Sequence, residues 1–181
     1  MNFTKCKIEG LVMLEPQLFG DERGYFFESF NLAEFEKSIG KSFQFVQDNQ
    51  SLSNKNVVRG LHFQAPPFDQ GKLVLVVQGS VLDVVVDIRI DSKTYGHHFS
   101  ILLTAENKKQ FWIPPGFAHG FATLEDQTIF QYKCTNYYQP SSEDCVLWND
   151  ETLKIDWQVE NPIVSEKDQK GKSWQEFSTP F

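Results

Sequence analysis

Apolar and polar residues alternate, or apolar residues run together, in short stretches that are spaced regularly along most of the chain. Turn-forming residues separate these stretches, for example Ala105-Glu106-Asn107 and Glu125-Asp126. Such a succession of short strands is typical of an antiparallel sandwich or barrel and disfavours a parallel α/β sheet. The expected strands are residues 8–14, 25–30, 73–78, 81–90, 99–103, 110–113, 120–124 and 128–134.

Two of these stretches are joined by a turn that favours a hairpin. Residues 73–78 and 81–90 are rich in β-branched side chains, and only Gly79-Ser80 separates them. A glycine that leads a two-residue connection is a common hairpin signal. We therefore expect these two strands to pair with each other.

One segment follows a helical period instead. Apolar residues recur between Leu32 and Ile39 at the spacing of one helix face. Asn31 is a suitable N-cap with Glu34 as its capping-box partner, and Gly40 supplies a C-terminal stop. We expect one short amphipathic helix with a structural role.

The C-terminal part is less regular. A second short helix is expected near residues 150–153, and residues 165–181 are polar and loop-like. We expect the ordered part of this segment to lie near residues 165–168, and residues 169–181 to form a loosely ordered tail.

Composition supports a single domain and excludes some classes of partner. With 181 residues the chain is long enough to bury one core, and its 17 Phe residues fit a β core. The net charge is −7, which disfavours nucleic acid or an anionic membrane as a partner, because both require a basic surface.

Cysteine usage and hydropathy indicate a cytoplasmic protein. Cys6, Cys134 and Cys145 are far apart and form no CxxC pattern, so neither a disulfide framework nor a thiolate metal site is indicated. No stretch approaches the ~18 apolar residues of a membrane span, and the first residues have no long apolar region. We expect no association with a membrane.

The densest candidate site lies in residues 57–73, where Arg59, His62, Gln64 and Lys72 precede a very apolar run. In an alternating strand, residues two apart share a face, and a small barrel can enclose one ligand. His62 shares a face with Gln64, and an inward-pointing Tyr132 would face it across a cavity. A histidine packed in the core, with solvated cations beside it, is the alternative.

A second motif, with the spacing PxGxxH, runs from Pro114 to His119 and matches the second half-motif of the cupin barrels. Metal-binding cupins also need two histidines at alternate positions in the first half-motif. Gln64 occupies the second of those positions here, although Asp69 lies near the expected acidic position. The pattern therefore favours His119 as a hydrogen-bonding or charge-bearing residue in a cavity without metal.

The third candidate is the charged sequence Ser165-Glu166-Lys167-Asp168 near the C-terminus. It is either a solvated charge cluster, or it folds back so that Asp168 orients the imidazole of His62. Spacing alone leaves both interpretations open.

Ten sequence motifs together resemble one family, the dTDP-4-dehydrorhamnose 3,5-epimerases. The motifs are DERGYFFESF, FVQDNQS, VVRGLHFQ, QGKLV, GSVLDVVVDIR, FWIPPGFAHGF, YKCTNYY, WND, IDW and SEKD, in this order over about residues 8–168. The resemblance implies an all-β, cupin-like double-stranded β-helix or jelly-roll barrel with short peripheral helices, formed as one domain over residues 1–181. It also implies a homodimer with exchanged N-terminal strands, and no metal or organic cofactor.

Residue roles follow from the same resemblance. His62 matches the proton acceptor, Asp168 its dyad partner, Tyr132 the proton donor, and Lys72 the residue that stabilises the enolate. Tyr138 matches an aromatic residue that stacks on the thymine ring. The other positions that match nucleotide-sugar contacts are Arg23, Glu28, Gln47, Asp48, Asn49, Arg59, His119, Glu143 and Lys167.

The implied reaction converts dTDP-4-dehydro-6-deoxy-D-glucose to dTDP-4-dehydro-L-rhamnose. The protons at C3 and C5 are both α to the 4-keto group, so a base can remove either one when the enolate is stabilised. Arginine suits the pyrophosphate, because a guanidinium binds phosphate oxygens bidentately. The alternatives are a single-centre epimerase acting on a related nucleotide 4-keto sugar, and a non-catalytic sugar-nucleotide-binding cupin.

Overall fold

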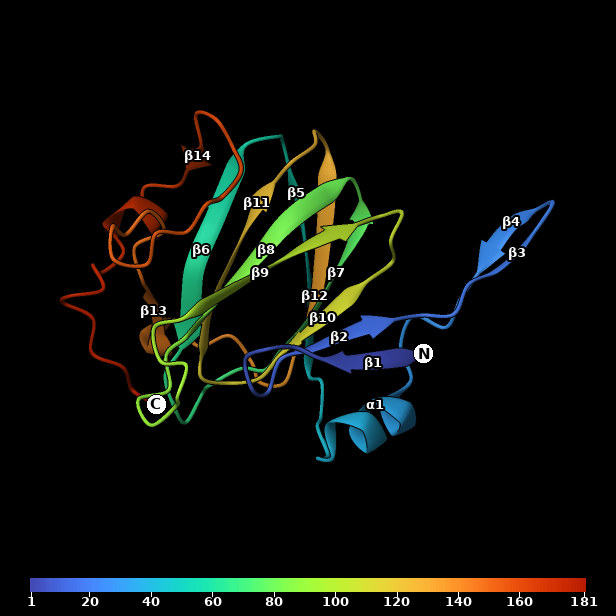
Figure 1. Ribbon diagram of the computed structural model, residues 1–181, viewed down its shortest axis with the longest axis horizontal. Coiled ribbons are helices and arrows are strands. Elements are labelled where there is room, and N and C mark those ends of the chain that lie inside the picture. The colour runs from blue at the N-terminus through green and yellow to red at the C-terminus, as the bar shows by residue number, and fades with distance from the viewer.

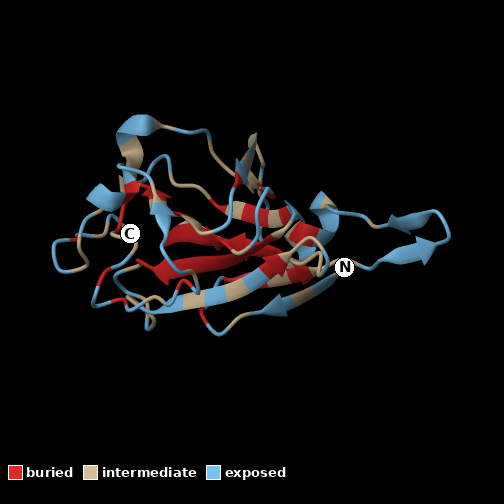
Figure 2. Ribbon diagram, turned by 90° about the horizontal axis from the view of Figure 1, so that it is seen from above, coloured by how far each residue is buried: buried red, intermediate tan, exposed pale blue.

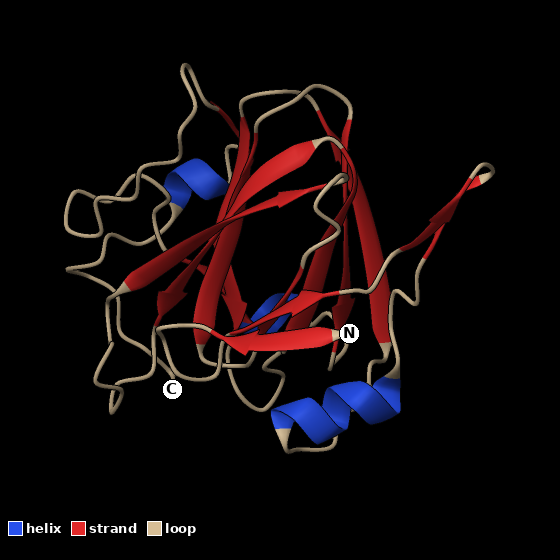
Figure 3. Ribbon diagram, turned by 45° about the vertical axis from the view of Figure 1, so that its right-hand side comes forward, coloured by secondary structure: helices blue, strands red, loops and turns tan.

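The computed structural model describes residues 1–181, and most of its strands form two facing sheets (Figures 1 and 3). The first sheet has the order β1 (Asn2–Lys5), β2 (Val12–Glu15), β10 (Gln110–Ile113), β7 (Lys72–Gln78), β12 (Thr128–Cys134), β5 (Gln47–Ser53). The second has the order β13 (Glu143–Cys145), β6 (Val57–Gln64), β11 (Phe117–Thr123), β8 (Ser80–Asp87), β9 (His98–Thr104). β14 (Ile163–Val164) pairs with β6 in parallel, and the other pairs are antiparallel.

One large core cluster lies between the two sheets. Val74 and Phe130 of the first sheet pack in one buried cluster with Val85 and Phe121 of the second. Burial of apolar side chains from two inner faces is what holds such a pair of sheets together. The predicted all-β, cupin-like class is confirmed, with the two sheets remaining separate hydrogen-bonded ladders.

The predicted hairpin across Gly79 is wrong. β7 pairs with β10 and β12, whereas β8 pairs with β9 and β11, so the chain crosses from one sheet to the other at this turn. Gly79 has φ +76 there, and a Cβ on it would lie 2.4 Å from Thr128 Oγ1. The glycine is therefore required by a close approach to β12, which the local sequence does not distinguish from a hairpin turn.

Two strand predictions in the N-terminal part need correction, and β5 was not predicted. β2 starts at Val12, because Gly10, with φ +97, lies in a turn that reverses the chain after β1. The strand expected over residues 25–30 is confirmed only within β4 (Gly24–Phe26), which forms a separate hairpin with β3 (Phe19–Asp21). β5 was missed because it is a polar edge strand, along which exposure alternates from residue to residue.

The predicted helix is confirmed as α1 (Leu32–Ile39). The Asn31 side chain accepts a hydrogen bond from the backbone N–H of Glu34 at 3.2 Å, as an N-cap does. Gly40 ends the helix with φ +76, in the left-handed conformation that glycine adopts without steric cost. Phe35 is fully buried and packs edge-on against Trp112, which fixes α1 against the first sheet.

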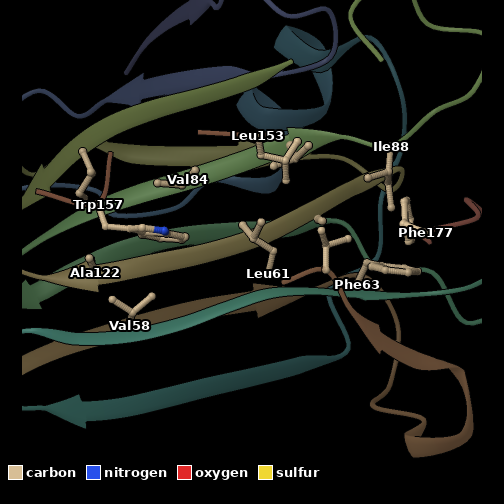
Figure 4. Packing of buried hydrophobic residues seen from close by; sticks show 13 residues of the cluster. Val58, Leu61, Phe63, Val84, Ile88, Ala122, Leu153, Trp157 and Phe177 are labelled. Carbon is tan, nitrogen blue, oxygen red and sulfur yellow. The ribbon is translucent and has the colours of Figure 1, made fainter. Parts of the chain in front are cut away.

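Residues 146–181 pack on the outer face of the second sheet. Figure 4 shows Trp157, Leu153 and Phe177 packed over side chains from β6 and β8, such as Leu61 and Val84. In Figure 2 the buried residues concentrate in the sheets, and the peripheral segments are largely exposed.

Local structure in this C-terminal region differs from the sequence expectations. The prediction of a helix near residues 150–153 is wrong, since this part of the chain forms a turn. Two short 3₁₀ helices occur instead, η1 (Pro140–Ser142) and η2 (Asp168–Lys170). The expected loose tail contains Phe177, which is buried, with Trp174 and Phe181 packed against the same cluster. Their aromatic side chains anchor a segment whose overall composition is polar.

None of the helices is long and apolar enough to cross a membrane.

Candidate active site

A cavity of about 410 Å³ opens between the two sheets. Strands β5, β7 and β12 line it from one sheet and β6, β11 and β13 from the other, and the segment around Asp168 closes one side. The cavity brings together most of the predicted site residues, namely His62, Lys72, Tyr132, Asp168, Gln47, Asn49, Arg59, His119, Tyr138, Glu143 and Lys167.

An irregularity in β6 places two of the candidates in this cavity. Arg59 and His62 are three residues apart, so regular alternation would point them to opposite faces. Gly60 between them has φ +129, and the β6–β11 register shifts between His119 and Phe121. Both side chains consequently line the cavity, where Arg59 donates to Ser53 Oγ at 3.1 Å.

Asp168 folds back onto His62. His62 Nε2 lies 2.7 Å from Asp168 Oδ1, and the Asp168 side chain is almost fully buried. Strand β14 beside β6 brings this segment back to the second sheet. Backbone hydrogen bonds, from the Lys172 N–H to the Cys145 carbonyl and from the Leu147 N–H to the Lys172 carbonyl, hold it there. Of the two sequence interpretations, the geometry fits a carboxylate that orients an imidazole.

The charge of Asp168 is stabilised by its surroundings. Burial alone would raise the pKa of the Asp168 carboxyl, but the contact with His62 and the hydrogen bonds from Ser165 and the Gly60 backbone together lower it. Asp168 is therefore a hydrogen-bond acceptor near neutral pH, which suits a residue that holds the ring of His62.

The other ring nitrogen, His62 Nδ1, lies 3.2 Å from Glu143 Oε1 and makes no hydrogen bond. Glu143 accepts hydrogen bonds at Oε2 from Tyr138 Oη at 2.6 Å and from Lys167 Nζ at 2.5 Å. Burial would raise the pKa of Glu143, but these two donors lower it overall. Glu143 thus lies between the imidazole of His62 and the side chains of Tyr138 and Lys167 at the cavity mouth.

Lys72 and Tyr132 enter from the opposite sheet. Lys72 Nζ lies 6.0 Å from the centroid of the Tyr132 ring. Burial lowers the pKa of the Lys72 ammonium, although the carboxylates of Asp83 and Glu143 oppose that shift. Burial also raises the pKa of the Tyr132 phenol, so that it stays protonated and can donate a proton.

His119 belongs to a buried pair that sequence reasoning missed. Its Nε2 lies 2.9 Å from Oδ2 of Asp83, and Asp83 is fully buried. Burial lowers the pKa of His119 and Asp83 opposes the shift. The other carboxylate oxygen of Asp83 has no hydrogen-bond partner. A single carboxylate within the apolar run of β8 is the sequence signal that could have identified Asp83.

Three predicted substrate contacts lie outside the cavity. Asp48 alternates with its cavity-lining neighbours on β5 and pairs with Lys133 at 3.0 Å instead. Arg23 is at the tip of the β3–β4 hairpin, where it pairs with Asp21, and Glu28 follows the hairpin. The hairpin projects away from the body of the protein (Figure 1).

Gln64, at the second position of the first cupin half-motif, makes hydrogen bonds to the backbone. Gln64 Oε1 accepts a hydrogen bond from the Gln139 backbone, and Nε2 donates to the carbonyls of Phe68 and Tyr137. His62, Cys145 and Asp168 are the only three residues whose potential metal-ligand atoms gather, within 4.8 Å of one another. The cavity residues that sequence reasoning did not select are Phe63, Gln64, Gln70, Gly120, Phe121, Phe130 and Ser165.

Comparison with known proteins identifies the family. The family described as dTDP-4-dehydrorhamnose 3,5-epimerase matches residues 5–176. The chain belongs to this family. It is 55% identical to the dTDP-4-dehydrorhamnose 3,5-epimerase of Salmonella typhimurium, over 93% of this chain and 92% of that one. The resemblance stated from the ten motifs is thereby confirmed.

Solved structures of epimerases share this fold. One is a dTDP-6-deoxy-D-glucose-3,5-epimerase from Legionella pneumophila in complex with dTDP-4-keto-L-rhamnose, at 47% identity and TM-score 0.92, covering 96% of this chain and 93% of that one. Another is a 3'-monoepimerase from Streptomyces bikiniensis in complex with dTDP-quinovose, at 31% identity and TM-score 0.90, covering 94% of this chain and 87% of that one.

Proposed function

We propose that this epimerase-family protein inverts both C3 and C5 of dTDP-4-dehydro-6-deoxy-D-glucose, giving dTDP-4-dehydro-L-rhamnose without a metal or organic cofactor. One observation carries the assignment. His62 and Tyr132 line the same cavity from opposite sheets, so a sugar between them would have a base on one ring face and an acid on the other. Inversion of a carbon centre requires this opposed arrangement.

In the first step, the His62 imidazole removes the proton from a carbon next to the 4-keto group. The electron pair of the broken C–H bond forms a double bond to C4, and the carbonyl electron pair moves onto the keto oxygen, which becomes the negatively charged enolate oxygen. Lys72 stabilises that charge, because its buried ammonium has a lowered pKa and is a better hydrogen-bond donor than a solvated lysine. Asp168 holds the His62 ring and stabilises the imidazolium that forms.

In the second step, Tyr132 returns a proton to the opposite face of the same carbon. The enolate collapses to the ketone with the centre inverted, and proton exchange with solvent restores the neutral imidazole and the phenol. The raised pKa of Tyr132 supports this role, because the phenol is protonated at neutral pH. The same two groups then act on the second carbon.

The nucleotide part binds toward the cavity mouth. Tyr138 is half exposed there and offers a ring face for stacking on the thymine. Arg59 and Lys167 supply positive charge for the pyrophosphate, and Gln47, Asn49, His119 and Glu143 supply polar contacts. This local basic and polar set accounts for an anionic substrate on a protein of net charge −7.

The active form is a homodimer in which the N-terminal hairpin reaches the partner subunit. Phe19, Tyr25 and Phe26 on that hairpin are 56%, 60% and 70% exposed, which favours burial against another surface. Arg23 and Glu28 would then contact substrate in the partner's cavity. The three cysteines are free thiols, which agrees with a cytoplasmic enzyme.

The test is incubation of the protein with dTDP-4-keto-6-deoxyglucose in D₂O, followed by NMR. Deuterium at both C3 and C5, with inversion at both, supports the double epimerase. Deuterium at one carbon only would establish the single-centre alternative, which the likeness to the Streptomyces bikiniensis monoepimerase keeps relevant. Binding of the sugar nucleotide without any exchange would indicate a non-catalytic cupin.

A further inference from the structure

A short segment after β12, residues 136–139, carries Tyr138 at the cavity mouth. Its backbone is held by the side-chain amides of three glutamines that come from separate parts of the chain. Gln47 lies on β5, Gln64 on β6, and Gln70 precedes β7. All three glutamines line the cavity.

The hydrogen bonds cover every residue of the segment. Gln70 Nε2 donates to the Asn136 carbonyl at 2.8 Å, and Gln64 Nε2 donates to the Tyr137 carbonyl at 3.2 Å. Gln47 Oε1 accepts from the Tyr138 backbone N–H at 2.9 Å, and Gln64 Oε1 accepts from that of Gln139 at 2.8 Å. Each residue of the segment therefore has one backbone group held by a glutamine side chain.

Gln64 is the central member. It is only 5% exposed and uses both ends of its amide, with a further bond from Nε2 to the Phe68 carbonyl at 2.6 Å. A carboxamide offers an acceptor oxygen and two N–H donors at one position. A histidine ligand or a carboxylate in its place could not satisfy a backbone N–H and two carbonyls together.

The far end of the Tyr138 side chain is also fixed. Its hydroxyl donates to Glu143 Oε2 at 2.6 Å, while its backbone is held by Gln47. The ring is nevertheless 50% exposed, so an open aromatic face stands at a defined position beside the cavity. Order at both ends of an exposed ring reduces the entropy lost when a flat ligand stacks on it.

We propose that Gln47, Gln64 and Gln70 form a clamp that positions Tyr138 for stacking on the nucleobase. They are positioning residues for nucleotide recognition. Gln64 and Gln70 act on affinity through Tyr138, whereas Gln47 is in addition one of the polar contacts proposed for the nucleotide. The inference rests on the proposed function in one respect, namely that the ligand at the mouth is a nucleotide. It assigns Gln64, at the position of a metal ligand in other cupins, to substrate specificity.

The first test replaces Gln64 with Glu, which keeps the shape and the acceptor but removes both N–H donors and places a carboxylate against two carbonyls. The expected result is a Kd for dTDP that rises about 10-fold, the loss expected when base stacking is weakened. KM for the dTDP-sugar should rise similarly, with a smaller change in kcat. Isothermal calorimetry with dTDP measures the affinity without requiring catalysis, so its outcome is independent of the epimerase assignment.

Gln78→Glu is the matched control. Gln78 makes the same kind of bond, from Nε2 to the Gln127 carbonyl at 3.0 Å, but it is exposed and lies outside the cavity. Its affinity for dTDP should equal that of the unmodified protein. If Gln64→Glu does not fold, Gln70→Leu removes a single bond from the clamp and should weaken dTDP binding in the same direction.

A double-mutant cycle distinguishes positioning from a general structural effect. If the clamp acts through the ring, Gln64→Glu should have no further effect on dTDP affinity in a Tyr138→Ala protein. Additive effects would overturn the proposal, and so would an unchanged Kd for Tyr138→Ala or for folded Gln64→Glu. Absence of deuterium exchange in the unmodified protein would instead count against the proposed function.

Discussion

At the scale of single residues, the proposed chemistry depends on an imidazole that lies between two carboxylates. His62 contacts Asp168 at 2.7 Å and Glu143 at 3.2 Å, and each carboxylate has its own donors that lower its pKa. In the proposed mechanism this arrangement keeps the base oriented and stabilises its protonated form.

Replacement of His62 by Ala should abolish most of the deuterium exchange. General base catalysis contributes typically ~10²- to 10⁴-fold, so the rate at C3 and C5 should fall by that order. The measurement is NMR in D₂O, with circular dichroism to establish that the variant is folded. An exchange rate equal to that of the unmodified protein would exclude His62 as the base.

Asp83 should control the protonation of Lys72. Burial lowers the Lys72 pKa, and the negative charge of Asp83 opposes this effect, as does that of Glu143. In Asp83→Asn that support is lost, so the Lys72 pKa falls further and the ammonium is lost at a lower pH. The alkaline limb of the pH–rate profile should therefore move to lower pH. A limb at the original position would show that Asp83 acts only on His119.

Asp87 should contribute stability to the folded state that is lost at acid pH. Burial raises its pKa, but hydrogen bonds from Arg89, Ser92 and Thr94 outweigh this and lower it from 3.8 to about 2. Because the folded-state pKa is depressed, this stability is present above pH ~4 and is lost as pH falls toward 2. It amounts to about 2 kcal/mol.

Asp87→Asn tests this assignment. The free energy of unfolding, measured with urea at pH 7, should fall by about that amount, and the difference from the unmodified protein should shrink at pH 3. An equal difference at both pH values would mean that the charge of Asp87 is not the source of the stability.

At the scale of elements, the site depends on a close approach of β6 and β11. A Cβ on Gly60 would lie 2.5 Å from the Cα of Gly120 and 2.8 Å from the carbonyl oxygen of His119. The two glycines thus allow the strands that carry His62 and His119 to come together at the irregular point of the ladder.

Gly60→Ala should destabilise the protein and reduce its activity. The methyl group would separate β6 from β11, and overpacking of this kind costs roughly 1–3 kcal/mol, to which the positive φ adds strain. Gly24→Ala is the control, since Gly24 has φ +126 with no atom near its Cβ position. Urea unfolding of both variants separates the cost of the contact with Gly120 from the cost of a positive φ at alanine. Equal losses in the two would show that the approach of Gly120 is unimportant.

At the scale of the whole molecule, the projecting β3–β4 hairpin is the feature behind the proposed homodimer. It carries exposed aromatic side chains, and Arg23 on it lies outside its own subunit's cavity. An exchanged hairpin would bury these side chains and deliver a guanidinium to the neighbouring site.

Subunit complementation tests the exchange. Arg23→Ala and His62→Ala proteins are each expected to be nearly inactive. When they are mixed under conditions that exchange subunits, each mixed dimer should contain one site with both residues intact, and activity should return. If Arg23 acts on its own subunit's site, no mixed site is intact and the mixture stays inactive. Sedimentation of the mixture checks that dimers have formed.

The local pattern of the sequence determined those elements whose signals lie within the element itself. The capped helix α1 and the strands β10 and β12 have the predicted boundaries, because side-chain period and cap chemistry report backbone conformation directly. The residue pattern singled out the cavity residues Arg59, His62, Lys72, His119, Tyr132 and Asp168. Gln47, Asn49, Tyr138, Glu143 and Lys167 came only from the resemblance to the epimerase family.

Only the tertiary structure decided which sheet each strand joins and which distant groups meet. The turn at Gly79 crosses between sheets although its chemistry resembles a hairpin, and the polar strand β5 exists because β12 offers it a free edge. Arg59 and His62 share the cavity because Gly60 interrupts the alternation of β6. Asp168 and Asp83 reach their histidines through strand order and chain return, which depend on long-range packing that no local period encodes.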